Sequence, residues 1–328
     1  MNLPEGIDEF LAAAGWGGAA IEPLAGDASF RRYFRVRAKD EDGDERSAML
    51  MDAPPPQEDT GPFLTVSHYL AEQGHRAPVI HAKDPARGLV LLEDFGTDRM
   101  RDWLDENPTA EEETYRKAID ALVALHASPP GPFPSYDMAA YQREVALLPE
   151  WFAPAAGFDI DADAYQAAWN EVLAPMLPRQ QPGVTVLRDY HAENIMLLPS
   201  GEQGLIDYQD ALVGHPAYDL VSLLQDARRD VAPGLERAML DHYAAQVAVG
   251  PDFEADYARL GAQRNAKIVG IFARLWKRDA KPRYLAFIPR VWDYLERDLA
   301  HPALAPVAQW FDANIPPEVR ARRGGGLG

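Results

Sequence analysis

Short runs of β-branched and aliphatic residues dominate the chain from about residue 21 to residue 95. Gly, Pro and Asp bound these runs, which is typical of strands, and we expect strands over 33–37, 48–51, 78–82 and 88–93. A helix is predicted over 61–74, because apolar residues recur there at helical spacing and Gly74 ends the run. This pattern predicts an antiparallel sheet with one helix packed on it.

After Phe95 the apolar residues recur with the period of amphipathic helices. In the segment 111–127, Tyr115, Ile119 and Leu122 share one face, and the acidic residues gather at the start, where they suit the helix dipole. The same period predicts further helices over 137–152, 162–176, 216–228, 232–248, 252–276 and 286–298. A strand-like segment, 184–208, interrupts them.

The two patterns together predict an α+β fold with two lobes. Residues 1–95 would form a small lobe built on the antiparallel sheet, and residues 96–328 a larger, mostly helical lobe. Ligand sites favour clefts between such lobes, so we expect the functional site there.

Composition narrows the possible functions. The 328 residues include 51 Asp and Glu against 32 Lys and Arg, a formal charge of −19, which argues against nucleic acid and anionic membranes as partners. No cysteine is present, which excludes disulfides, thiolate metal sites and a cysteine nucleophile. The first residues lack the basic and apolar pattern of a signal peptide, and no apolar run reaches membrane-spanning length. We therefore expect a cytoplasmic protein.

Three polar residues stand out in the strand-like segment, LRDYHAENIMLLPSGEQGLIDYQD at 187–210. Asp189, Asn194 and Asp207 flank short apolar runs, although Asp and Asn are poor strand formers. A hairpin of the runs NIMLL and GLID would bring its outer ends together, so two carboxylates and one carboxamide would converge. Such hard oxygen ligands suit Mg²⁺, which takes one or two protein carboxylates and completes its shell with phosphate and water.

The motifs RDYHAEN and LIDYQDA resemble those of the aminoglycoside phosphotransferase and choline kinase-like family, which has a protein-kinase-like fold. The resemblance implies ATP as phosphoryl donor, Asp189 as catalytic base, and Asn194 and Asp207 as Mg²⁺ ligands. His191 matches a histidine common in this loop, and Asp219 resembles an aspartate that supports it. The alternative is that Asp189 and Asp207 only cap strand ends; their spacing and the lobe order favour the catalytic interpretation.

The nucleotide lobe departs from the kinase pattern. The segment AGDASFRRYFRV stands in place of a glycine-rich loop, with Gly26 and Ser29 able to form a turn over a phosphate. Met51 or Asp52 occupies the position expected for a phosphate-binding lysine.

The small lobe still offers candidate nucleotide contacts. Arg31, Arg32 or Arg35 could supply the missing positive charge, although the three could equally form a solvated face. The segment Glu93 to Phe95, in LVLLEDFG, resembles the hinge whose backbone binds adenine.

The acceptor site is expected in the helical lobe. The segment 263–295 is rich in Lys and Arg and carries aromatic residues, which suits a sugar with an anionic group better than a polycation, although solvated helix faces would look the same. The wider set of motifs, including MDAPP, LLQDARRDV and GIFARLWKRDAKPRYL, resembles the branch of bacterial kinases that phosphorylate N-acetylmuramate and N-acetylglucosamine at the anomeric hydroxyl in cell-wall recycling. The candidate acceptor residues are His191, Arg228, Trp276 and Arg278.

Two alternatives remain open at this point. Another acceptor, such as choline, an aminoglycoside or a different sugar, would keep the chemistry and change only the pocket. The absent lysine would also fit a catalytically inactive nucleotide-binding module.

Overall fold

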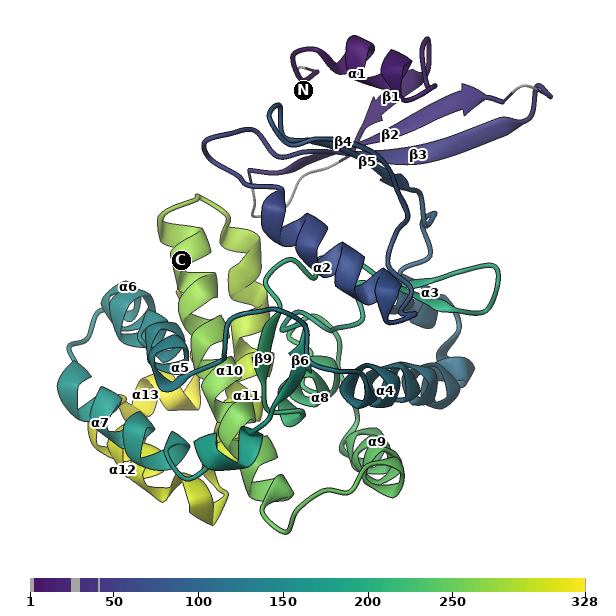
Figure 1. Cartoon of the computed structure of the whole chain (residues 1–328). Coiled ribbons are helices and arrows are strands. Elements are labelled where there is room, and N and C mark those ends of the chain that lie inside the picture. The colour runs from purple at the N-terminus through teal and green to yellow at the C-terminus, as the bar shows by residue number, and fades with distance from the viewer. Residues whose placement is uncertain (1–2, 25–29, 41, 328) are drawn as a thin grey trace. The chain divides into compact units, whose positions relative to one another are not determined.

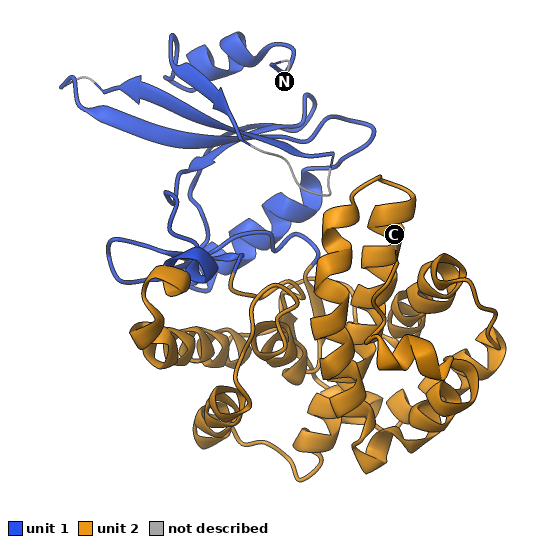
Figure 2. Ribbon diagram, turned by 180° about the vertical axis from the view of Figure 1, so that it is seen from behind, with its two compact units in different colours: residues 1–103, 193–210 blue, residues 104–192, 211–328 orange. Residues whose placement is uncertain are grey.

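The computed structural model describes residues 3–24, 30–40 and 42–327, which form two compact units (Figure 2). Unit 1 consists of Met1–Trp103 and Glu193–Asp210; unit 2 consists of Leu104–Ala192 and Ala211–Gly328. The division differs from the expected boundary after residue 95. The small unit extends to Trp103, and it also contains the hairpin that carries Asn194 and Asp207.

Unit 1 is built on a five-stranded antiparallel sheet with the strand order β1-β2-β3-β5-β4 (Figure 1). A separate two-stranded hairpin pairs β7 with β8. The elements are α1 (Ile7–Ala13), β1 (Ala20–Pro23), β2 (Arg32–Lys39), β3 (Glu45–Asp52), α2 (Gly61–Glu72), β4 (Ile80–Asp84), β5 (Leu89–Glu93), β7 (Ile195–Leu197) and β8 (Gln203–Leu205), with α3 (Met100–Glu106) running across the boundary into unit 2.

The two faces of the sheet have different roles. Side chains alternate along a strand, and Phe34 and Val36 of β2 lie with Leu50 of β3 in the buried cluster that receives Phe10 and Leu11 of α1. The odd-numbered residues of β2 therefore face the other side of the sheet, the side on which Figures 1 and 2 show α2.

The segment that follows β8 is attached to α2. The ring of Tyr208 stacks on Phe63 with 5.4 Å between centroids, and its hydroxyl lies 2.8 Å from the hydroxyl of Ser67. Both α2 residues are buried. These contacts explain why residues 193–210 belong with unit 1.

Unit 2 is mostly helical, with one short β-ladder between β6 and β9. Its elements are the short helices η1 (Pro108–Ala110), η2 (Leu148–Phe152), η3 (Leu177–Gln180), η4 (Pro282–Phe287) and η5 (Pro302–Leu304), the strands β6 (Val184–Val186) and β9 (Leu212–Gly214), and the helices α4 (Glu111–Ala127), α5 (Met138–Val145), α6 (Ala153–Ala156), α7 (Ala162–Leu173), α8 (Ala217–Leu224), α9 (Pro233–Gln246), α10 (Phe253–Lys277), α11 (Ile288–Leu299), α12 (Ala305–Asn314) and α13 (Pro317–Ala321).

The long helix α10 lies at the centre of unit 2 and packs against α11, α8, α5 and η2 (Figure 1). Buried aromatic side chains, among them Trp292 and Tyr141, fill the spaces around it. Every residue of α8 is buried, including Asp219, which is typical of a helix enclosed on all sides. No described helix is long and apolar enough to cross a bilayer.

The structure confirms the predicted α+β class and the position of each predicted strand to within a few residues. Two differences concern the helices. The predicted helix 137–152 divides into α5 and a π-helical turn, η2, and the predicted helix 216–228 ends at Leu224. The pattern did not predict β1, β9, α1, α3, α12 or α13, because these elements are short or carry weak periodicity.

The contact between α10 and η2 predicts an effect on stability. A Cβ atom at Gly270 would overlap the backbone of Leu147, which cannot move independently of its helix. Gly270→Ala is therefore expected to lower the free energy of unfolding by about 1–3 kcal/mol, as overpacked sites do. Gly234→Ala in α9, where the Cβ would meet nothing within 4 Å, is the matched control and should be neutral or stabilising. Urea unfolding of both variants measures the difference, and equal stabilities would contradict it.

Candidate active site

The loop that carries Asp189 begins at the end of β6 and is held by α8. Both carboxylate oxygens of Asp219 accept backbone hydrogen bonds, at 2.7 Å from the N–H of Leu187 and at 2.8 Å from the N–H of Arg188. Arg188 has a φ of 71°, a left-handed conformation that side-chain-bearing residues rarely adopt. The two hydrogen bonds therefore fix a strained turn immediately before Asp189, the supporting role that the sequence predicts for Asp219.

Asp219 itself titrates abnormally. Burial raises its pKa to about 7, although the N–H groups of Leu187 and Arg188 and the charge of Arg264 oppose this shift. The buried carboxyl group of Asp219 is therefore hydrogen-bonded to two backbone N–H groups where an exposed one would be hydrogen-bonded to water. Its function is to shape the loop.

Asp189 is half-buried and lies among cations. Burial raises its pKa, but the permanent charges of Lys267, Arg264 and Arg188, together with His191 when it is protonated, lower it by a larger amount, so the net pKa is below the ordinary value. The carboxylate is therefore ionised at neutral pH, the state in which it can accept a hydrogen bond and a proton from a hydroxyl group.

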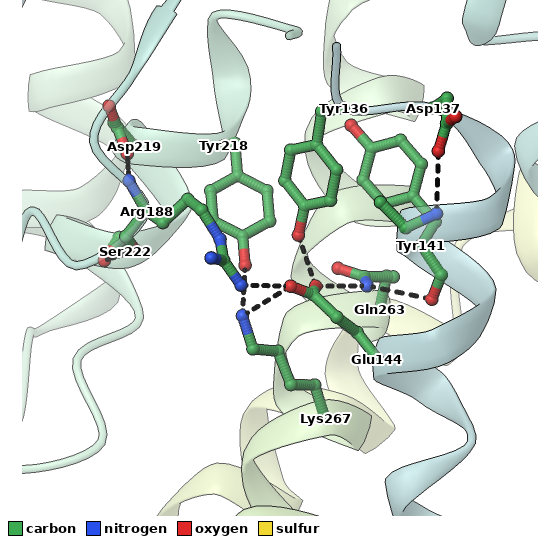
Figure 3. Close-up of polar contacts among 11 residues, drawn as sticks. Tyr136, Asp137, Tyr141, Glu144, Arg188, Tyr218, Asp219, Ser222, Gln263 and Lys267 are labelled. Atoms are coloured by element: carbon green, nitrogen blue, oxygen red, sulfur yellow. Dashed lines mark hydrogen bonds and ion pairs between the residues drawn. The ribbon is translucent and has the colours of Figure 1, made fainter. Parts of the chain in front are cut away.

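A buried carboxylate on α5 organises these cations (Figure 3). Glu144 accepts hydrogen bonds from Arg188, from the ammonium of Lys267 at 2.9 Å, and from the amide of Gln263 at 3.0 Å. The hydroxyl of Tyr136 donates to it as well. Burial raises the pKa of Glu144, but Lys267 and Arg188 overcome this effect and hold it at about 2. One carboxylate thus opposes two cations that also neighbour Asp189.

Sequence reasoning did not select Glu144, Arg188 or Lys267 as site residues. One sequence signal could have found them: a charged residue stands at a helix position where the spacing of the apolar residues predicts a buried side chain. Lys267 lies three residues after Arg264 on α10, so both side chains lie on one side of the helix. Arg264 is only 4% exposed. Buried cations need partners, and those partners mark the site.

His191 and Arg228, both predicted to bind the acceptor, are brought together. An Nη atom of Arg228 lies 3.3 Å from Nε2 of His191. Burial lowers the pKa of His191 to about 4, so the imidazole is neutral at physiological pH. Asp226 joins them, because its carboxylate accepts hydrogen bonds from the N–H of Arg228 at 2.8 Å and from that of Ala192 at 3.3 Å.

Trp276 and Arg278, the other predicted acceptor residues, lie at the end of α10. Arg278 is exposed and pairs with Asp279, at 2.8 and 2.9 Å, and the ammonium of Lys277 lies 3.7 Å from the centre of the Trp276 ring. Arg278 follows Lys267 by 11 residues, which is roughly 16 Å along a helix axis. The structure does not group these two residues with His191 and Arg228.

The two predicted metal ligands, Asn194 and Asp207, belong to unit 1. The amide nitrogen of Asn194 lies 3.4 Å from a carboxylate oxygen of Asp207, and the amide of Gln209 donates to the other oxygen at 2.9 Å. The hairpin β7–β8 brings the two predicted metal ligands together, and the N–H of Ile206 donates to the carbonyl oxygen of Asn194 at 3.1 Å. Asp207, two residues after β8, has a φ of 59°, a left-handed conformation that ends the regular alternation of side chains along the strand.

The pair fits a Mg²⁺ ion that is shared with phosphate. Among the described residues no three His, Cys, Asp or Glu side chains are grouped as a metal site. Mg²⁺ needs only one or two protein carboxylates when phosphate oxygens and water complete its octahedron. One carboxylate with one carboxamide would supply that protein share, and a metal held there would supply positive charge for phosphate groups.

Each of the three candidate arginines, Arg31, Arg32 and Arg35, is paired with a carboxylate. Nε of Arg32 donates to Asp52 at 2.7 Å, and Arg35 binds Asp94 through two bonds of 2.7 and 3.0 Å. Nε of Arg31 donates to Glu58 at 3.1 Å. The alternative of a solvated face therefore does not hold for Arg31 and Arg35, whose side chains are only 11% and 12% exposed, whereas that of Arg32 is 31% exposed.

The predicted hinge follows β5. The carboxylate of Glu93 binds the guanidinium of Arg76, at 2.5 and 2.8 Å, and the N–H of Val79 at 3.1 Å. The ring of Phe95 is buried beneath Arg76 and against Gly204, where a Cβ atom would overlap it. The side chains thus fix the backbone, which is the part that an adenine would contact. The predicted phosphate residues Gly26 and Ser29 lie outside the described residues.

The chain is similar in sequence to known phosphotransferases. A model of the phosphotransferase enzyme family matches residues 20–262. The N-acetylmuramate/N-acetylglucosamine kinase of Caulobacter vibrioides is 39% identical over 95% of this chain and 96% of its own. The enzyme of the same name from Pseudomonas aeruginosa is 38% identical, with 94% of each chain covered. The chain belongs to the phosphotransferase enzyme family, and it is a kinase.

Solved structures support the fold. The choline kinase LicA of Streptococcus pneumoniae aligns with a TM-score of 0.65 at 14% identity, covering 91% of this chain and 97% of that one. The aminoglycoside phosphotransferase APH(3'')-Id of Streptomyces rimosus, solved with ADP and streptomycin, aligns with a TM-score of 0.54 at 19% identity, covering 79% and 96%. The predicted two-lobe kinase-like fold is confirmed.

The Glu144 network predicts a pH-dependent loss of stability. Glu144→Gln leaves Arg188 and Lys267 without their counter-charge and is expected to lower the free energy of unfolding at pH 7 by about 3–5 kcal/mol. The pKa of Glu144 is depressed to about 2 in the folded state, so its contribution is complete above its ordinary value and is lost as the pH falls through 2. The difference between the variant and the parent should therefore shrink on acidification.

Urea unfolding of both proteins at pH 7 and pH 3 measures this difference. Glu171→Gln, at an exposed position of α7, is the matched control and should change stability by less than about 0.5 kcal/mol. A Glu144→Gln protein as stable as its parent at pH 7 would show that the network carries no net stabilisation.

Proposed function

We propose that this protein is an ATP-dependent kinase of an N-acetylated amino sugar, N-acetylmuramate or N-acetylglucosamine, and that it phosphorylates the anomeric hydroxyl. The observation that carries the proposal is the similarity to kinases of that name at 36–39% identity, over 83–95% of the chain. A role in cell-wall recycling follows from the acceptor, and such a role belongs in the cytoplasm.

The charges around Asp189 support this acceptor class. Lys267, His191, Arg264 and Arg188 are the groups that act on its pKa, and the three that are permanently charged are cations. A polycation such as an aminoglycoside would be repelled there, whereas a neutral or anionic sugar is tolerated or attracted. His191 and Arg228, which are in contact, are the proposed acceptor residues; Trp276 and Arg278 stay predictions.

The proposed mechanism divides the work between the two units. Asp189 orients the acceptor hydroxyl and takes its proton as the new O–P bond forms and the bond to the leaving ADP oxygen breaks. Asn194 and Asp207 would hold Mg²⁺, which would supply positive charge for the triphosphate. Glu93 to Phe95 provide the backbone that binds adenine. Phosphoryl transfer depends mainly on such positioning and charge stabilisation.

A panel of acceptors tests the function. With ATP and Mg²⁺, N-acetylmuramate and N-acetylglucosamine should be phosphorylated, and choline and kanamycin should not. An anomeric product is a glycosyl phosphate, which releases inorganic phosphate in mild acid, whereas a phosphate on a primary hydroxyl is stable. Turnover of choline or kanamycin alone would overturn the amino-sugar assignment, and an acid-stable product would overturn the anomeric position.

Asp189→Asn tests the base and separates an enzyme from a binding module. The variant keeps the shape of the side chain and loses the proton acceptor, so kcat should fall by roughly 10²- to 10⁴-fold. The Kd for ATP, measured by calorimetry, should stay within about twofold of the parent. Asp163→Asn, at an exposed position at the start of α7, is the control and should keep full turnover. An Asp189→Asn protein with parental kcat would remove Asp189 from the mechanism.

A further inference from the structure

The nucleotide lobe needs a cation where kinases place a lysine, and β3 does not supply one. Met51 is fully buried, and Asp52, the other residue at this point, is an acid that is 2% exposed. Asp52 is already paired with Arg32 and offers no positive charge to a triphosphate. The positive charge must therefore come from a neighbouring segment, and the three arginines at 31, 32 and 35 are the candidates that the sequence offers.

The alternation of β2 separates these candidates. Arg32 lies opposite Asp52 in the register of β2 and β3, on the face that also carries Phe34 and the α1 core. Its guanidinium neutralises Asp52 and lies 5.9 Å from the centre of the Phe34 ring. Arg32 is therefore already bound to Asp52, and it lies on the α1 face of the sheet, opposite to the face that carries Tyr33.

Arg35 shares the opposite face with Tyr33 but serves the hinge. Two of its nitrogens bind the carboxylate of Asp94, and one of them also donates to the carbonyl oxygen of Gly96 at 2.9 Å. The N–H of Gly96 in turn donates to Asp94 at 3.0 Å. These bonds fix the segment after β5, so Arg35 stabilises the backbone around Phe95.

Arg31 lies beside the position expected for the lysine. Tyr33 is opposite Met51 in the register of β2 and β3, and Arg31 precedes Tyr33 by two residues, the spacing of one face of a strand. The side chain of Arg31 bonds to Tyr33 and, through Nε, to Glu58, which lies in the segment before α2. A guanidinium here stands close to the point at which kinases place the lysine that contacts the triphosphate.

We propose that Arg31, held by Glu58 and Tyr33, is the residue that binds the triphosphate in place of the missing lysine of β3. The proposal rests on the kinase function above. The Arg31–Glu58 ion pair then corresponds to the lysine–glutamate pair that kinases require for activity, with the cation supplied by the start of β2 and the acid by the loop before α2. A guanidinium presents five N–H donors in a planar fork, which suits phosphate oxygens and leaves Nε for the carboxylate.

Direct nucleotide binding tests this assignment without any acceptor. Calorimetry compares the Kd values of Mg-ATP and adenosine for the parent, Arg31→Gln and Arg31→Lys. Arg31→Gln should weaken Mg-ATP binding roughly 10- to 100-fold, the range expected on losing a charge-assisted hydrogen-bond pair, and leave the adenosine Kd unchanged. Arg31→Lys keeps the charge and loses the fork, so a smaller loss is expected. That variant carries the test if Arg31→Gln does not fold.

Arg37→Gln is the matched control, since it removes one positive charge from the same face of β2 at a position whose side chain is 54% exposed. It should bind both ligands as the parent does. Equal losses for ATP and adenosine in Arg31→Gln, or no loss for ATP, would overturn the proposal. Because no sugar is present, a failure of the amino-sugar assignment would leave this result intact.

Discussion

Buried charge of one sign must be opposed by charge of the other, and in this molecule Glu144 meets that need for the loop that carries Asp189. Arg188 occupies a left-handed backbone conformation, with its N–H bound to Asp219 and its side chain bound to Glu144. Lys267 reaches the same carboxylate from α10. Without this acid, two enclosed cations would repel each other directly beside the strained turn. The geometry of the loop therefore depends on a residue that contacts no reactant in the proposed mechanism.

The net charge of the chain does not describe the charges that surround Asp189. The molecule carries a formal charge of −19, yet the permanently charged groups that lower the pKa of Asp189, against the effect of burial, are the cations Lys267, Arg264 and Arg188. Acidic residues gather elsewhere, for example at the start of α4. Potential in an enclosed site is set by the nearest groups, whereas net charge governs solubility and long-range encounter. An anionic acceptor is thus compatible with an acidic protein.

The sequence predicted the fold class, the strands and the pairing of Asn194 with Asp207, because period-two alternation and a hairpin are local properties. It did not predict Glu144 or Lys267 as site residues, because their contact joins helices that are far apart along the chain. The three arginines show the same limit. Composition could not separate Arg31, Arg32 and Arg35, whereas strand register and the carboxylate that each one binds separated them at once.

The chain crosses between the two units three times, after Trp103, after Ala192 and after Asp210. A fragment that ends at residue 103 would lack the ring of Tyr208, which covers Phe63 of α2, and the complementary fragment would carry the hairpin without its support. Neither piece is self-sufficient. After a proteolytic nick at Trp103, residues 1–103 would be held to the rest of the chain only by non-covalent contacts such as the stack of Tyr208 on Phe63, because the other two crossings lie within residues 104–328. Exchanging either lobe by splicing at the first junction alone would therefore separate the hairpin segment from α2, on which it packs.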